Sequence, residues 1–109
     1  MSYKLQALTA LRDKVKAGDH RVGMWKAVPH ELHPHVPEYA RQAFLGSLDA
    51  AKALHESVLP GWGYEICNGA EVTLRQYSKK IIFKNVCPAR AWLLAILDAL
   101  IAQEGTDHE

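Results

Sequence analysis

Apolar residues recur at helical spacing in two segments of the N-terminal half. Residues 3–17 carry a stripe formed by Leu5, Leu8, Leu11 and Val15. Gly18 follows this stripe as a residue suited to end a helix. A second helix is predicted from Pro37, a residue favoured in the first helical turn, to Val58. Gly46 and Ser47 interrupt its pattern, which predicts either a kink or two helices with Ser47 capping the second.

Residues 19–36 lie between these segments and show no periodicity. They predict a loop that is long for a small domain, with Trp25 docked on the core to hold it.

The period changes to alternation in residues 62–86, which predicts strands instead of helices. Asn68-Gly69 is a strong hairpin signal because both residues tolerate positive φ. A second turn is expected at Ser78-Lys79, before a third strand over residues 81–86. Residues 88–105 then return to helical spacing in the most apolar helix of the chain.

This order of elements indicates an α+β fold. A small antiparallel sheet is not stable with both faces in water, so helices must cover at least one face. We expect residues 1–109 to form a single domain, with a three-stranded antiparallel β-meander covered by three to four helices in the order α-α-β-β-β-α.

Composition narrows the classes of function. The 109 residues are 49% hydrophobic and carry a net charge of +1, which offers no strong field for nucleic acid or an anionic membrane. No apolar run approaches the roughly 20 residues of a membrane span. We therefore expect a cytoplasmic protein whose two cysteines, Cys67 and Cys87, are free thiols.

The densest group of chemically capable side chains is HELHPH at residues 30–35. It places His30, His33 and His35 close together, a candidate metal site. The spacing lacks the two histidines four apart that a helical zinc site requires, and Pro34 stops any helix before His35. A solvated loop without metal is the preferred interpretation, and no cofactor is expected.

Two further residues have a chemical interpretation beside a structural one. His55 lies on the apolar stripe of the second helix, as a catalytic base or as a core histidine bonded to a backbone carbonyl. Cys87 precedes a helix N-terminus, where a thiol becomes reactive, but a small buried residue is favoured.

Basic residues gather on the predicted second and third strands. With Tyr77 and Phe83 they suggest an alternative surface for single-stranded nucleic acid, formed by Arg75, Lys79, Lys80 and Lys84. Alternation puts Lys84 on the face opposite Phe83, and lysines also protect an open sheet edge.

The last helix is apolar nearly all round, which requires burial on more than one side. Either the domain surrounds it or a second subunit does. We predict a homodimer, and the hypothetical interface consists of Ala91, Leu94, Ala95 and Asp98.

Two stretches carry a resemblance to known proteins. GSLDAAKALHESVLPGWGYEI at residues 46–66 and CPARAWLLAILDALIAQEG at residues 87–105 resemble small phage and prophage proteins of Gram-negative bacteria. The resemblance covers about half of the chain and excludes HELHPH. That group has no established activity, so it implies a phage-derived accessory protein and assigns no residue a role.

These observations favour a non-enzymatic protein that acts through contact with an unknown protein partner. A nucleic-acid-binding protein using the basic strands, or a metal or thiol enzyme using the histidine-rich loop, is the alternative.

Overall fold

The computed structural model describes residues 3–18, 25, 35–67, 71–77, 79–85 and 87–106. Its elements are α1 (Tyr3–Ala17), α2 (Val36–Phe44), α3 (Leu48–Val58), β1 (Gly63–Cys67), β2 (Glu71–Gln76), β3 (Lys79–Lys84) and α4 (Pro88–Thr106). The predicted α+β fold is confirmed, with the predicted second helix divided into α2 and α3.

The division between α2 and α3 has the local cause that the sequence indicates. Gly46 adopts a φ of 111°, which an L side chain rarely tolerates. The hydroxyl of Ser47 then accepts a hydrogen bond from the amide of Ala50 at 3.1 Å and caps α3. A left-handed glycine followed by a capping serine ends one helix and starts the next.

The three described strands form an antiparallel sheet in the order β1-β2-β3. Tyr64, Leu74 and Ile81 share one row across it. β3 begins and ends two residues earlier than predicted, because Lys79 pairs with Gln76 as the first residue of the strand. The expectation that Lys79 lies in the turn is therefore wrong; Tyr77, with a φ of 55°, occupies a turn position instead.

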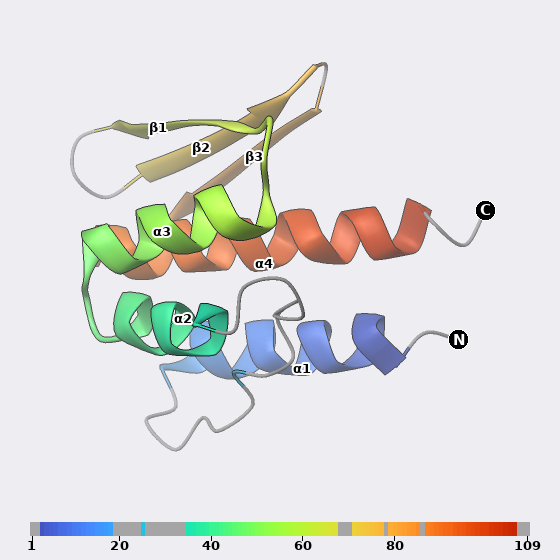
Figure 1. Ribbon diagram of the computed structural model, residues 1–109, viewed down its shortest axis with the longest axis horizontal. Helices are drawn as coiled ribbons and strands as arrows, with labels where there is room; N and C mark the ends of the chain where they lie inside the picture. The colour runs from blue at the N-terminus through green and yellow to red at the C-terminus, as the bar shows by residue number, and fades with distance from the viewer. Residues whose placement is uncertain are drawn as a thin grey trace.

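Helix α4 lies at the centre of the molecule. Figure 1 shows the sheet on one side of α4 and α3, with α1 and α2 on the other side. α4 contacts α1, α2, α3, β2 and β3. Its long apolar run is therefore covered on every side by elements of the same chain, which accounts for its lack of a polar face.

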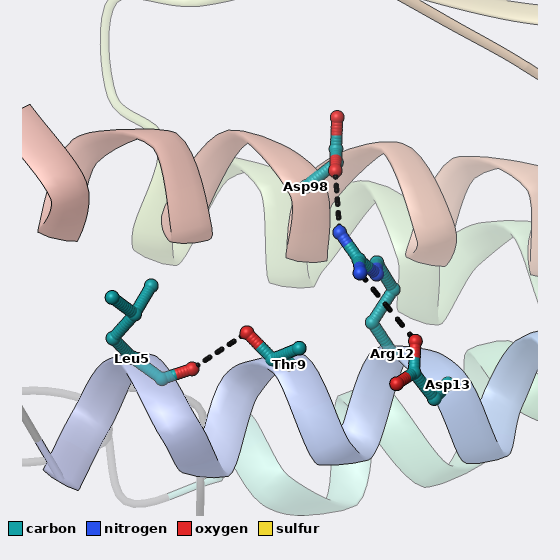
Figure 2. Close-up of polar contacts among 5 residues, drawn as sticks. All are labelled: Leu5, Thr9, Arg12, Asp13 and Asp98. Carbon is teal, nitrogen blue, oxygen red and sulfur yellow. Dashed lines mark hydrogen bonds and ion pairs between the residues drawn. The ribbon is translucent and has the colours of Figure 1, made fainter.

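α1 runs along α4 and is joined to it by a polar contact at the border of the core (Figure 2). Arg12 Nη1 donates to Asp98 Oδ1 at 3.1 Å, and Arg12 Nη2 lies 3.4 Å from Asp13 Oδ1. On the same helix, the Thr9 hydroxyl donates to the carbonyl oxygen of Leu5 at 2.8 Å. The buried residues of α1 belong to the hydrophobic core that α4 shares: Leu8, Leu11 and Val15.

A second joint holds the C-terminal end of α2 against the start of α4. Arg90 donates from Nε and Nη2 to the Phe44 carbonyl at 3.2 and 3.0 Å, and its guanidinium lies 4.2 Å from the centre of the Phe44 ring. Trp25 packs on the same ring with a centroid separation of 5.7 Å. This confirms that Trp25 docks on the core; the other residues of the predicted loop between Asp19 and Pro34 lie outside the described part.

Candidate functional site

Among the three strands, the edge strand β1 is the most exposed. Every residue from Gly63 to Ile66 is exposed, including Tyr64 at 42% and Ile66 at 37%. Alternation puts these two side chains on the face of the sheet that points toward the helices. β2 and β3 fill that face over α4 with Val72, Leu74, Ile81 and Phe83, whereas β1 leaves its apolar side chains partly in solvent.

The two edges of the sheet differ in their protection. β3 carries three exposed lysines, Lys79, Lys80 and Lys84, of the kind that discourages pairing with a foreign strand. β1 carries no lysine and no proline between Gly63 and Ile66. Its one charged residue there, Glu65, lies with its carboxylate 3.6 Å from the guanidinium of Arg75 on β2. Among the described residues, the β1 edge therefore lacks the lysines that protect the β3 edge against strand pairing.

The start of β1 is fixed to the helices by His55, which is 2% exposed. His55 Nε2 lies 2.8 Å from the carbonyl oxygen of Trp62, and His55 Nδ1 accepts from Trp92 Nε1 at 3.2 Å. The expectation of a core histidine bonded to a backbone carbonyl is confirmed. Both ring nitrogens are engaged with core groups, so neither is offered to a substrate.

Aromatic rings complete this cluster. The Tyr64 ring meets His55 edge-on with a centroid separation of 5.0 Å and lies 4.6 Å from the ring of Trp92. The indole N–H of Trp62 is buried without a hydrogen-bond partner among the described groups, and an unsatisfied buried donor costs stability. The cluster thus joins α3, α4 and β1 through rings, with two satisfied polar bonds and one unsatisfied donor.

Burial lowers the pKa of His55, because the surroundings disfavour a charged imidazole. The hydrogen bond to the Trp62 carbonyl and the charge of Glu56 oppose this shift, but burial is the larger effect. His55 is consequently neutral at neutral pH, as the core bonds require.

The structure places the predicted interface residues of α4 inside the domain. Ala91 and Ala95 have no exposed surface, and Leu94 is 2% exposed. Asp98 is half-buried and paired with Arg12 of its own chain. The surplus apolar surface that motivated an interface on α4 is thus covered by α1, α2, α3 and the sheet. Ala91, Leu94 and Ala95 have almost no exposed surface left for a second subunit, whereas Asp98 is partly exposed.

The residues of the predicted basic surface do not form one continuous patch of cations and aromatic rings, because two of the cations lie beside carboxylates and Phe83 lies on the other face of the sheet. Arg75 and Lys84 lie within 3.6 and 3.4 Å of Glu65 and Glu71. Lys80 shares their face of the sheet, and Phe83 packs against the core on the opposite face, as the alternation predicts. Tyr77 is fully exposed at the turn, so it is the aromatic ring that remains available near these cations.

The candidate metal site falls mostly outside the described residues, since His30 and His33 are not among them. His35 is exposed at the start of α2, 6.4 Å from the ring of Tyr39. Within the described ranges, no three His, Cys, Asp or Glu side chains gather in a way suited to a metal ion. Cys87 is a free, half-buried thiol whose amide donates to Asn85 Oδ1 at 3.0 Å.

The alternating pattern of β1 does not reveal that its apolar side chains are exposed. Tyr64 and Ile66 alternate like the buried residues of β2, and only the position of β1 at the edge distinguishes them. The absence of lysine from β1, beside the lysines of β3, is the sequence feature that separates the two edges.

Comparison with known proteins finds no matching family model, no matching curated protein and no matching solved structure. No helix within the described ranges combines the length and hydropathy needed to cross a bilayer.

Proposed function

We propose that this protein is a non-enzymatic interaction module, a cytoplasmic accessory protein of phage or prophage origin, that contacts another polypeptide along β1. The observation that carries the proposal is the open, apolar edge formed by Gly63 to Ile66. An edge strand offers unpaired backbone groups for an added strand, and alternate side chains such as Tyr64 and Ile66 supply specificity.

A second copy of this chain is the partner that β1 fits best. Pairing around a two-fold axis at Tyr64 sets the two Tyr64 rings opposite each other and each Glu65 opposite Gly63 of the second copy. No like charges then meet, and each Glu65 keeps its contact with Arg75. A register centred on Glu65 is disfavoured because it sets two carboxylates opposite each other.

The basic strands support the nucleic-acid alternative less well. Two of the four cations lie beside carboxylates, and the aromatic Phe83 is on the other face of the sheet. Stacking platforms for single strands need aromatic rings and cations on the same surface.

Substitution of matched isoleucines on the two edges tests the proposal. Ile66→Lys places a lysine on the β1 edge, and Ile82→Lys places one on β3, where Ile82 is 48% exposed. Light scattering across a concentration series measures the association of each variant. We expect wild-type chains to dimerise, Ile66→Lys to weaken the dimer by about tenfold or more, and Ile82→Lys to leave it unchanged.

A wild-type chain that stays monomeric at high concentration would refute self-association through β1. Equal weakening by Ile66→Lys and Ile82→Lys would show that the contact does not use the β1 edge. Circular dichroism on each variant verifies that the fold is retained.

A further inference from the structure

The hydrogen bonds of His55 fix its tautomer. The indole nitrogen of Trp92 carries a hydrogen and is a donor only, so His55 Nδ1 must present its lone pair across the 3.2 Å contact. The single proton of the neutral ring therefore sits on Nε2, which donates to the Trp62 carbonyl at 2.8 Å. Only the neutral Nε2–H tautomer satisfies both contacts at once.

A second proton would disrupt this arrangement. It would have to bind Nδ1, where it would face the N–H of Trp92 and leave two donors opposed inside the core. The charged ring would also be almost fully buried, where an ion without a partner is costly.

The surroundings provide little compensation for such a charge. From the start of β1, the Tyr64 ring and the Trp62 carbonyl face His55, and from α4 the Trp92 indole does. Glu56 is the neighbouring carboxylate on α3 itself and is exposed. On the described inner face of the sheet, Lys79 is the charged residue, and it is a cation that cannot neutralise a charged imidazole.

Two of the groups that His55 contacts, the Trp62 carbonyl and the Tyr64 ring, lie at the start of β1. Trp62 directly precedes the strand, and Tyr64 is its second residue. We propose that His55 is an acid-sensitive latch: protonation of its ring releases the start of β1 from α3 and α4 and thereby weakens strand pairing at the β1 edge. The second part of this statement rests on the proposed function; the release of β1 does not.

The direction of titration agrees with this geometry. Burial lowers the pKa of His55, so the latch stays closed at neutral pH and opens only in acid. Glu56 and the Trp62 carbonyl act in the opposite direction but do not reverse the shift.

Nitrogen NMR of the imidazole ring, followed from about pH 8 to about pH 5, tests the latch. At the upper pH we expect the Nε2–H tautomer in His55. Amide hydrogen exchange of residues 63–66 is measured over the same range and corrected for the intrinsic effect of pH. We expect protection in β1 to fall about tenfold or more as His55 gains its proton.

Two glutamine substitutions serve as a matched pair. His55→Gln keeps one donor and one acceptor at the site but cannot be protonated in this range, so β1 protection should no longer respond to acid. His35→Gln removes an exposed histidine and should leave the wild-type response intact. Light scattering is the third measurement, and it should show a dimer that dissociates more readily in acid for wild type and His35→Gln only.

The outcomes separate the latch from the proposed function. Constant β1 protection while His55 titrates, or an unchanged acid response in His55→Gln, overturns the latch. A wild-type monomer at every pH whose β1 protection still falls with His55 titration upholds the release of β1 and refutes the dimer. A dimer that is insensitive to acid while β1 is released overturns the link between the latch and the contact.

Discussion

Helix α4 and strand β1 both carry apolar residues, but α4 is buried in the fold and β1 is exposed. From Ala89 to Leu100, every residue of α4 is buried except the half-buried Arg90 and Asp98. In β1, every residue from Gly63 to Ile66 is exposed. α4 contacts helices on one side and the sheet on another, whereas β1 occupies an edge (Figure 1). Position in the fold, more than apolar composition, decides which element has surface left for a partner.

The contrast places the surface that is available to a partner on β1 instead of on α4. An all-round apolar helix indicates that something covers each of its sides, and here the same chain supplies every cover. Two of the exposed apolar side chains, Tyr64 and Ile66, lie on a strand whose alternating pattern is ordinary. A partner that adds a strand to β1 would extend the sheet without disturbing α4.

Introducing a charge into each element is the most severe test of the contrast. Leu94→Asp places a carboxylate at a position that is 2% exposed and removes a packed side chain. We expect it to cost at least about 3 kcal/mol of unfolding free energy and to abolish the folded state at moderate temperature. Thermal unfolding followed by circular dichroism measures this loss.

The matched change on the strand is Ile66→Asp. Because Ile66 is already partly in water, we expect a folded protein that loses only about 1 kcal/mol. The contrast fails if Leu94→Asp remains a folded monomer while the wild type is a dimer, because Leu94 would then lie at an interface.

Removing the polar atoms of His55 tests the joint between the two elements. His55→Leu keeps an apolar side chain of similar size but leaves the Trp62 carbonyl and the Trp92 indole N–H without their partner. Two unsatisfied buried groups predict a loss of roughly 2–3 kcal/mol. Denaturant unfolding measures it, with His35→Leu as the exposed control. A loss no larger than that of the control would mean that the two bonds add nothing to stability.

Acid should weaken the same joint in the unmodified protein. Since burial lowers the folded pKa of His55 below its ordinary 6.5, the unfolded chain binds more protons over the interval between the two values. The stability from His55 is therefore complete above about pH 6.5 and declines as pH falls toward the lower folded value. One such group contributes at most about 1.4 kcal/mol per pH unit. Denaturant unfolding at several pH values measures this slope, which should be smaller in His55→Leu; equal slopes would assign the acid sensitivity to other groups.

The elements of the fold could be predicted from local signals because their causes are local. Gly46 and Ser47 divide α2 from α3, and alternation identifies the strands. What covers α4 could not be predicted, because it depends on α1 packing from the opposite end of the chain. The same holds for His55: its position on a stripe indicated burial, but its second partner, Trp92, lies 37 residues away.

The smallest expected effect concerns the border of α4, where Asp98 meets Arg12 (Figure 2). A double-mutant cycle with Arg12→Ala and Asp98→Ala isolates the interaction of the pair. Both side chains are partly in water, 27% and 35% exposed, and Arg12 also contacts Asp13, so we expect a coupling of only about 0.5 kcal/mol. Asp13→Ala is the control that removes this competing contact. A coupling above about 2 kcal/mol would mean that the pair is desolvated in solution. Asp98 would then be covered by something beyond this chain, which would restore the predicted interface at this position of α4.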